Sequence, residues 1–429
     1  MRAGDCAANS SSKENCHCYR FRRYDHLRWG GLPVGRLSLC NLNEGCAEKA
    51  PILLHRRRTM NYSAYVGLDV HKTTIAIAVA EAGRGSEVRF FGEIANSPDA
   101  LATLLKKLGA RHGKLYFVHE AGPCGYGLYR QIIDAGHVCD VVSPAHTPRR
   151  AGDRIKTDRR DAIMLARLSR AGELTKVWTP DYAHEAMRDL IRSREVASKD
   201  VRQARQRVQG FLLRNGRRYA GAVWKRSHRV WLGNQTFDHP AQQIAFQTHL
   251  NAMDQAVERK LEIEKQIQAL LPDWSLGPVV EALQALRGVA LAVAAGVVAE
   301  VGDFQRFDNP RQLMAYLGLV PGERSSGETR RPTSITKAGS IVARKLIVEA
   351  AWAYRMPAKI GQAMQRRQEG ATAEVRAIAW KAQVRLCARY RRMLARRKTP
   401  PVVITAIARE LVGFIWAIGR SVKPRMIAA

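Results

Sequence analysis

The chain has 429 residues, 70 of them Lys or Arg and 38 Asp or Glu, so its formal net charge is +32 at neutral pH. A hydrophobic fraction of 46% excludes a wholly disordered basic polymer and leaves room for two or three domains, while the basic excess favours nucleic acid over an anionic membrane as partner. No apolar run reaches the roughly 18–20 residues of a membrane span, and the first residues lack the apolar core of a secretory signal, so we expect a cytosolic protein without a membrane.

Residues 1–59 differ in composition from the rest of the chain. They hold five of the eight cysteines, show no hydrophobic periodicity and end in a basic run before Met60. We interpret them as a non-native extension upstream of a start at Met60; a disordered basic arm that touches nucleic acid is the alternative. The tripeptide Cys16-His17-Cys18 lacks the paired spacing of structural zinc sites, so its role stays open.

Residues 60–180 predict an α/β domain. Apolar, β-branched runs predict strands at 65–69, 74–80, 87–91, 114–119 and 137–142, and helical spacing predicts helices at 98–108, 125–135 and 161–171. A basic segment at 144–158 has no clear period and is expected to be a loop. Three antiparallel strands followed by alternating helices and strands match the order of a ribonuclease H (RuvC-like) fold.

The rest of the chain predicts helices. In 181–275, two long helices with narrow apolar stripes, broken at 233–240, are typical of an antiparallel or intermolecular coiled coil, whose arginines could also grip a nucleic-acid backbone. In 276–429 we expect a helical domain. Its segment 286–304 has two helical halves around Gly288, similar to a helix-hairpin-helix that offers backbone N–H groups to phosphates. A basic stretch from 355 to 398 is a candidate phosphate-binding face, and a last helix at 402–418 is expected to pack onto the core.

Four acidic residues occupy positions that suit metal chemistry. Asp69 and Glu120 each close an apolar strand, where a carboxylate is costly to bury unless it is paired or bound to a metal. Asp158 and Asp161 are spaced i, i+3 at the start of a helix and so share one face, although acids favour helix N-termini for structural reasons and Asp158 could be an N-cap. In a ribonuclease H sheet the first strand lies beside the fourth and the last helix crosses both. All four carboxylates could then hold one or two Mg²⁺ ions against a phosphodiester.

A candidate nucleophile, Ser326, lies far downstream in a Gly-, Ser- and Arg-rich segment. We expect this segment to be a flexible loop between a helix that ends near Leu319 and one that starts near Lys337. A serine nucleophile needs activation, and because no histidine is near, the acidic site would have to supply it. The cationic side chains that could neutralise a phosphate there are Arg324, Arg330, Arg331 and Lys337.

At these residues the chain resembles the DEDD transposases of the IS-one-ten/IS-eleven-eleven insertion-sequence family. The resemblance runs from about residue 62 to 400 and is carried by the segments GLDVHK, HEAGPCGYGLYRQI, KTDRRDAIMLARL and GLVPGERSSGETRR. RGVA at 287–290 departs from the P-G-[VI]-G turn that is frequent in relatives. The resemblance implies a RuvC-like N-terminal domain and a C-terminal transposase domain. It assigns the family's acidic tetrad to Asp69, Glu120, Asp158 and Asp161 and the serine nucleophile to Ser326.

The same resemblance implies an RNA-guided recombinase. Ser326 would form a transient phosphoserine link to DNA, followed by strand exchange, excision through a circle and insertion at a specific target. A structured bridge RNA would pair with donor and target double-stranded DNA, and dimers would assemble into a tetramer, in the bacterial cytoplasm at the nucleoid. Two alternatives stay open: a RuvC-type structure-specific endonuclease that does not need Ser326, and a non-catalytic nucleic-acid-binding protein.

Overall fold

A computed structural model describes residues 62–83, 86–148, 157–326 and 329–425. The predictions made for residues 1–59, including the start at Met60 and the Cys16-His17-Cys18 segment, lie outside the described residues. So does most of the basic segment predicted at 144–158.

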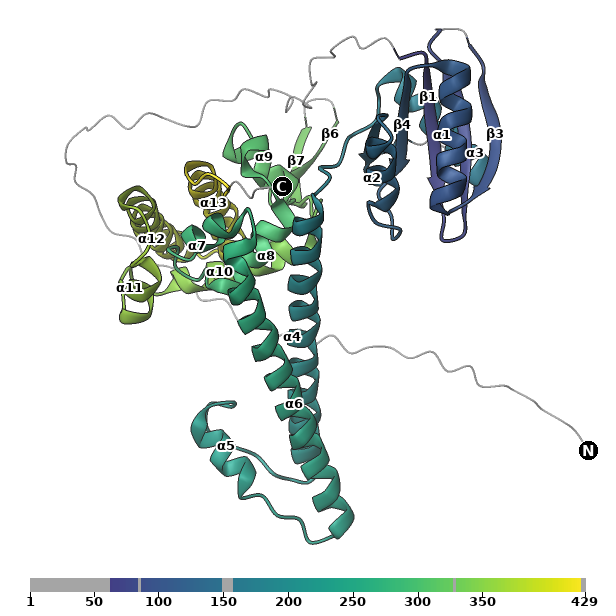
Figure 1. Cartoon of the computed structure of the whole chain (residues 1–429). Coiled ribbons are helices and arrows are strands. Elements are labelled where there is room, and N and C mark those ends of the chain that lie inside the picture. The colour runs from purple at the N-terminus through teal and green to yellow at the C-terminus, as the bar shows by residue number, and fades with distance from the viewer. Residues whose placement is uncertain (1–61, 84–85, 149–156, 327–328, 426–429) are drawn as a thin grey trace, which may run out of the picture. The chain divides into compact units, whose positions relative to one another are not determined.

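The N-terminal part contains a five-stranded mixed sheet (Figure 1). Its strands are β1 (Ala64–Val70), β2 (Thr74–Glu81), β3 (Val88–Ala95), β4 (Leu115–Glu120) and β5 (Val138–Val142). The order is β3-β2-β1-β4-β5, in which β1, β2 and β3 are antiparallel neighbours while β4 lies parallel to both β1 and β5. The predicted strand order of a ribonuclease H fold is confirmed, and the main difference is that β3 continues to Ala95 rather than ending at residue 91.

Helices cover both faces of this sheet. Alternate residues of a strand point to opposite faces, and in β1 the even-numbered Val66 and Leu68 share an apolar cluster with Leu105 of α1 (Pro98–His112) and Ile132 of α2 (Gly127–Asp134). The other face carries small residues, mainly alanines of β2, against which α3 (Asp158–Ala171) packs. Because Asp69 is odd-numbered, its side chain belongs to the α3 face.

A long helical hairpin follows. It consists of α4 (Tyr182–Arg214) and α6 (Pro240–Leu270), with the short α5 (Arg226–Gly233) between them. Arg194 pairs with Glu264 at 2.5 Å and Asp200 with Arg259 at 3.6 Å, so the two helices run antiparallel within one chain. The two long helices were predicted; α5 was not, because its eight residues lie in a stretch without a continuous apolar stripe.

The C-terminal part is mainly helical. Its elements are α7 (Gly277–Leu283), α8 (Leu291–Val301), α9 (Pro310–Tyr316), β6 (Pro321–Ser326), β7 (Thr329–Ile335), α10 (Ile341–Ala351), α11 (Gln362–Gln368), α12 (Ala373–Ala395) and α13 (Pro400–Ser421), with 3₁₀ turns at Leu271–Asp273, Phe304–Arg306 and Trp352–Arg355. One large apolar cluster joins these helices to the base of the hairpin through Met187, Ile191 and Ile267.

Helix α13 corrects the expectation that no apolar segment is long enough to span a membrane. It has 22 residues and a mean hydropathy of 1.8 over its most apolar window, which meets the length and composition of a span. However, half of that window is buried inside the protein, and Ile407, Leu411 and Ile415 are fully buried in the same cluster as α7, α10 and α12. These contacts are those of a central core helix.

The segment 286–304 contains one α-helix, α8, rather than two helical halves; the turn at Gly288 joins α8 to α7, which ends at Leu283. Gly288 has a φ of +79°, and a Cβ atom there would lie 2.3 Å from the carbonyl oxygen of Ala350 in α10. The glycine is therefore explained by a left-handed turn packed against α10. Phosphate binding by this turn stays a prediction.

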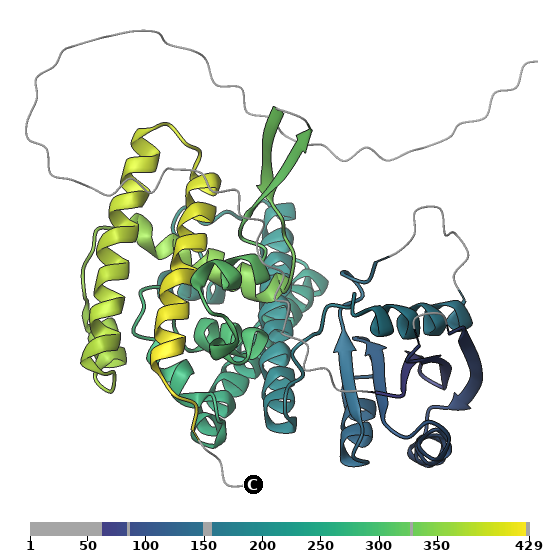
Figure 2. The same ribbon diagram turned by 90° about the horizontal axis from the view of Figure 1, so that it is seen from above.

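The expected flexible loop around Ser326 is instead a two-stranded ribbon, and the flanking helices are shorter than predicted. β6 and β7 are paired antiparallel, and the ribbon extends outward beyond the neighbouring helices (Figure 2). Helix α9 ends at Tyr316 and α10 begins at Ile341. The alternation typical of a strand is hidden in the sequence because neither face of this ribbon presents a row of apolar residues.

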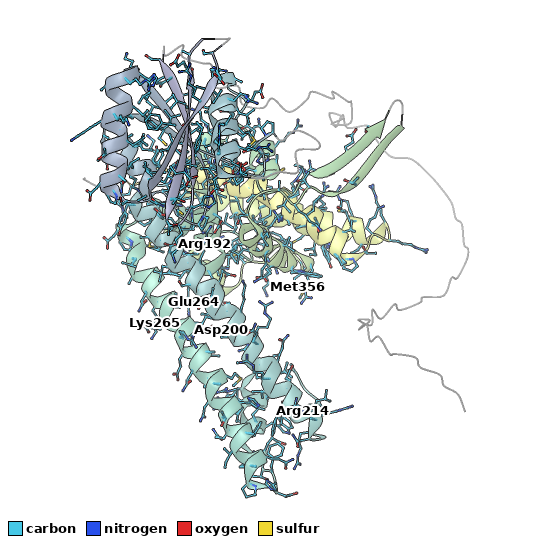
Figure 3. The ribbon with its side chains drawn as sticks, turned by 90° about the vertical axis from the view of Figure 1, so that its right-hand side faces the viewer. Arg192, Asp200, Arg214, Glu264, Lys265 and Met356 are labelled. Carbon is cyan, nitrogen blue, oxygen red and sulfur yellow. The ribbon has the colours of Figure 1, made fainter. Side chains whose placement is uncertain are left out.

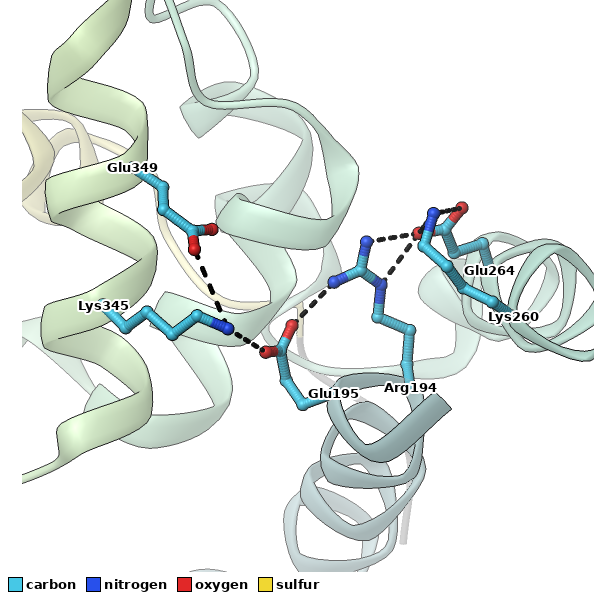
Figure 4. Close-up of polar contacts among 6 residues, drawn as sticks. All are labelled: Arg194, Glu195, Lys260, Glu264, Lys345 and Glu349. Carbon is cyan, nitrogen blue, oxygen red and sulfur yellow. Dashed lines mark hydrogen bonds and ion pairs between the residues drawn. The ribbon is translucent and has the colours of Figure 1, made fainter. Parts of the chain in front are cut away.

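Charged side chains connect the hairpin to α10 (Figure 4). Arg194 contacts Glu195 at 2.6 Å and Glu264 at 2.5 Å, and Lys345 contacts Glu195 at 3.5 Å and Glu349 at 3.7 Å. The side chain of Glu195 is only 9% exposed, so its charge depends on these partners.

Candidate metal centre at the edge of the sheet

The candidate centre lies at the carboxyl ends of β1 and β4. Asp69 is the penultimate residue of β1 and Glu120 the last of β4. Because these strands are parallel neighbours, their carboxyl ends meet at one edge of the sheet. Val118 of β4 packs with Leu165 of α3, and Glu120, two residues further on, belongs to the same face as Asp69.

Gly67 brings α3 close to this edge. A Cβ atom at Gly67 would lie 2.4 Å from the carbonyl oxygen of Ala162 and 2.5 Å from the backbone nitrogen of Ala166, both in α3. Any larger residue would push the helix away from β1. The glycine therefore allows the first turn of α3, which carries Asp158 and Asp161, to lie against the end of β1.

The start of α3 differs from the prediction. The helix begins at Asp158 rather than at 161, and Thr157 is the N-cap, since its side chain accepts a hydrogen bond from the backbone of Arg160 at 3.3 Å. Asp158 is thus not the capping residue, and its carboxylate is available for other contacts. Both aspartates stand in the first helical turn, as predicted.

His71 joins two of the acids. Its Nε2 atom lies 3.3 Å from Asp69 Oδ2 and 3.2 Å from Asp158 Oδ1, so it stands between the end of β1 and the start of α3. Asp69, His71 and Asp158 can each offer one ligand atom, and these atoms lie within 4.8 Å of one another. His71 is not among the residues predicted from the sequence. Its signal was the sequence DVH, which places an imidazole two residues after a strand-end carboxylate.

Electrostatics at this site favour a cation. The pKa of Asp69 is raised, chiefly because burial removes water from its carboxylate; Asp161 and Asp158 raise it further, and His71 opposes them. The effect of Asp161 on Asp69 places its charge near the cluster. Three carboxylates gathered in this way repel one another unless a positive charge lies between them.

The donor atoms suit a divalent metal ion. Glu120 Oε1 is buried and accepts no hydrogen bond from any residue that the structure describes, and the buried Asp69 Oδ2 has only His71 Nε2, at 3.3 Å, beside it. Buried carboxylate oxygens left in this way are costly unless an ion or water meets them. Oxygen ligands suit Mg²⁺, and an added imidazole would also suit Mn²⁺ or another transition metal.

Ser326 lies apart from these residues in the chain, as the last residue of β6, where its backbone pairs with Thr329. The neighbouring Ser325 donates a hydrogen bond to Glu323 at 2.5 Å. The side chains of Ser326, Arg324, Arg330 and Arg331 lie outside the described part of the protein. Lys337 is exposed, with a φ of +57°, in a turn where its backbone nitrogen donates to Gly318.

The strand order, the position of α3 and the acidic edge are those of a ribonuclease H-like domain. A family model described as "Transposase" matches residues 66–215, which include this domain and α4. A second, described as "Transposase IS116/IS110/IS902 family", matches residues 280–366, which include the ribbon with Ser326.

Whole-chain comparisons agree. The chain is 52% identical over 379 residues to "Putative transposase y4qE" of Sinorhizobium fredii, covering 88% of this chain and 94% of that protein. It is 32% identical over 345 residues to the "Transposase for insertion sequence element IS1533" of Leptospira borgpetersenii, covering 79% of this chain and 99% of that protein. It is 23% identical over 376 residues to the "Pilin gene-inverting protein" of Moraxella bovis, covering 84% of this chain and 97% of that protein. The chain belongs to the IS116/IS110/IS902 family of insertion-sequence transposases.

Proposed function

We propose that this transposase is an RNA-guided DNA recombinase that uses a divalent metal, with Mg²⁺ as the natural ion, and Ser326 as its nucleophile. The observation that carries the proposal is the acidic edge, where Asp69, Asp158 and His71 converge and the buried Glu120 Oε1 has no hydrogen-bond donor among the described residues. Asp69, Glu120, Asp158 and Asp161 are the proposed ligands. A bound ion would stabilise negative charge on the reacting phosphate.

The proposed reaction is two transesterifications. The hydroxyl oxygen of Ser326 forms a bond to phosphorus, and the bond from phosphorus to the departing deoxyribose oxygen breaks. The serine proton passes to a carboxylate of the acidic site, and the departing oxygen takes up a proton. In the second step a deoxyribose hydroxyl of another strand forms a bond to phosphorus and gives its proton to a carboxylate of the acidic site, while the bond from phosphorus to the serine oxygen breaks and that oxygen takes up a proton.

The remaining parts of the proposal concern partners. A structured bridge RNA would pair with donor and target double-stranded DNA, and the net charge of +32 favours binding both polymers. Because Ser326 and the acids stand on different segments of the chain, the acidic domain of one subunit could join the ribbon of another. We propose dimers that pair into a tetramer, with the α4–α6 hairpin as a contact between subunits. The proposed divisions are 60–180 for the acidic domain, 181–275 for the hairpin and 276–429 for the serine-bearing domain.

The test is a recombination assay with purified protein, Mg²⁺, donor and target DNA, and RNA transcribed from the element's ends. Wild-type protein is compared with Ser326→Ala, the matched control Ser325→Ala and Asp69→Asn on denaturing gels that retain protein–DNA adducts. We expect an adduct that needs RNA and Ser326, that survives Ser325→Ala, and that is absent in Asp69→Asn or in the presence of EDTA.

Two alternatives make different predictions in the same assay. A RuvC-type endonuclease would keep full cleavage in Ser326→Ala and lose it in Asp69→Asn. A non-catalytic nucleic-acid-binding protein would bind RNA and DNA without any adduct or cleavage. The separation of Ser326 from the acids along the chain is the feature that keeps the endonuclease as the second candidate.

A further inference from the structure

We infer that the far half of the α4–α6 hairpin, residues 201–253, is a folded nucleic-acid-binding arm that holds a phosphodiester backbone along one face of α4. We call these residues the distal arm. This surface is separate from the acidic edge and from Ser326, so the inference does not rest on the chemistry proposed for either.

The charge of the distal arm is one-sided. From residue 201 to 237 the chain has no Asp or Glu, and Asp238 is the only acid before Asp254. The basic side chains within that stretch are Arg202, Arg205, Arg207, Arg214, Arg217, Arg218, Lys225, Arg226 and Arg229. Arg229 pairs with Asp254 at 2.5 Å, and the other cations form a long run of positive charge with little internal neutralisation, which favours a polyanionic partner.

A shallow pocket on the arm collects part of this charge. It has a volume of about 370 Å³ and is lined by Gln203, Gln206, Arg207, Gly210, Arg214 and His249. The five residues of α4 recur at helical spacing and form one stripe, and Figure 3 shows Arg214 toward the far end of the hairpin. Neither Arg207 nor Arg214 makes an ion pair with a carboxylate of the described residues; the Arg214 guanidinium lies over the Phe211 ring, a contact that leaves its N–H groups available to a ligand.

A second pocket, nearer the base of the same hairpin, provides a contrast. It is lined by Gln255, Glu258, Arg259, Leu261, Glu262 and Lys265. Here Lys265 pairs with Glu262 at 3.5 Å, and Arg259 pairs with Asp200 at 3.6 Å. Because acids balance the bases, this second pocket offers no net attraction to an anion. The unbalanced charge is specific to the distal arm.

The arm is held in shape by its own small core. Val208, Phe211, Leu232, Phe246 and Met253 form an apolar cluster across α4, α5 and α6. The buried ring of His228 packs among Tyr219, Trp224 and Trp231, which fixes α5 onto the end of the hairpin. The arginines therefore project from a folded surface, and little ordering is needed on binding.

The length of the stripe indicates a polymer. From Gln203 to Arg214 the helix rises roughly 16 Å, which is too long for one phosphate and equals about five nucleotides at 3.4 Å each along a strand. Gly210 lies in the middle of the stripe, and apart from the neighbouring backbone of α4 a Cβ atom there would meet only Arg214 Nη1, at 3.7 Å, so the floor is open. Arginines would meet phosphate oxygens, and the glutamine amides would add N–H donors without reading sequence.

The experiment measures binding of full-length protein to fluorescent 25-nucleotide probes of mixed sequence, one of duplex DNA and one of single-stranded RNA. Anisotropy is followed from 50 to 300 mM KCl for wild type, for Arg207→Gln with Arg214→Gln, and for the matched control Arg259→Gln with Lys265→Gln. Loss of two phosphate contacts is expected to lower the salt slope by about 1.4–1.8 and to raise Kd about three- to tenfold for at least one polymer. The control, which removes the same charge from the balanced pocket, is expected to change Kd by less than about twofold.

A second pair of variants tests the pocket on the distal arm without removing a cation. Gly210→Glu places a carboxylate beside Arg214, and Gly210→Gln adds similar volume without charge; both improve helix propensity, so folding is retained. We expect Gly210→Glu to weaken binding more than Gly210→Gln. A rise in Kd that is confined to the RNA probe or to the DNA probe supports binding by the distal arm and identifies which of the two polymers the arm binds. Three outcomes would overturn the inference. The two double variants could raise Kd equally, or neither could change Kd. Poly-glutamate could also displace the probes as well as a nucleic acid of matched charge does.

Discussion

At the scale of single residues, Gly67 controls the distance between the sheet and α3. A Cβ atom at this position would overlap two backbone atoms of α3, which no side-chain rotation can relieve. We predict that Gly67→Ala destabilises the protein by about 1–3 kcal/mol through overpacking and abolishes DNA cleavage, because Asp158 and Asp161 move away from Asp69. Chemical unfolding and the cleavage assay measure the two effects.

Gly127 provides the control. It lies in α2, and a Cβ atom there would meet nothing within 4 Å. Gly127→Ala should leave cleavage unchanged and raise stability by up to about 1 kcal/mol, since Ala is the better helix former. If Gly67→Ala behaved like this control, α3 would not need its close approach to β1.

His71 is a second residue whose role can be measured. Its imidazole contacts Asp69 and Asp158, and nitrogen ligands favour transition metals over Mg²⁺. We predict that His71→Ala lowers affinity for Mn²⁺ on the order of tenfold and leaves affinity for Mg²⁺ within about threefold, as measured by calorimetry. A rise in Mg²⁺ affinity would contradict this, because it would identify His71 as a positive charge that competes with the metal.

The sequence predicts much of this site and misses part of it. Asp69 and Glu120 could be selected because carboxylates rarely end apolar strands without a partner, and the structure places both strand ends at one edge. The position of Asp158 on α3 was predicted, but the capping role of Thr157 was not. His71 was missed because a histidine in a tight turn has many uses. Only the three-dimensional structure shows that the ring of His71 lies between Asp69 and Asp158.

At the scale of elements, the ion-pair network connects the hairpin to α10 (Figure 4). Glu195 lies between Arg194 and Lys345, and its side chain is 9% exposed. We predict that Glu195→Ala lowers the free energy of unfolding by about 1.5–3 kcal/mol, since two cations lose a shared partner. Urea unfolding followed by circular dichroism measures the change.

Arg229→Ala is the comparison for that variant. Arg229 and Asp254 also form an ion pair across the hairpin, but their side chains are 47% and 41% exposed. Its loss should cost less than about 1 kcal/mol because water screens the pair. Equal costs for the two variants would mean that burial does not strengthen the network.

The sequence predicts helices and strands better than it predicts which of them pack together. Long apolar stripes identified α4 and α6, yet a stripe does not say which helix it packs against. In the structure, ion pairs such as Arg194–Glu264 join the two helices within one chain. The β6–β7 ribbon was predicted as a loop because its alternation has no apolar face. Bounds shifted by a few residues where a cap such as Thr157 starts the helix.

At the scale of the whole molecule, stability should depend on pH through buried histidines. Burial lowers the pKa of both His184 and His228 below the ordinary value of 6.5. The unfolded chain then binds more protons than the folded one as pH falls below about 6.5. Stability is fully present above that pH and falls as the pH decreases from about 6.5 toward the lowered pKa of each folded-state histidine, by at most about 1.4 kcal/mol per pH unit for each group.

His184→Gln isolates one of these groups. The ring of His184 packs against Trp178 and Trp274 and contacts the carbonyl oxygen of Ala299 at 2.9 Å, a contact that a glutamine amide could also make. Thermal unfolding between pH 7.5 and 5.5 should show a flatter pH dependence for this variant than for wild type. An unchanged slope would mean that His184 has the same pKa in the folded and unfolded chains.

The hairpin also sets a distance. Arg194, in the network at its base, and Arg214, on the distal arm, are twenty residues apart on α4, which corresponds to roughly 30 Å along a continuous helix. That is about nine base pairs of duplex at 3.4 Å each. A rigid strut of this length fixes how far from its base a nucleic acid can be held. Adding or removing helical turns in both α4 and α6 would change that span in steps of about 5.4 Å, and with it the distance at which the proposed distal arm would hold a nucleic acid from the base of the hairpin.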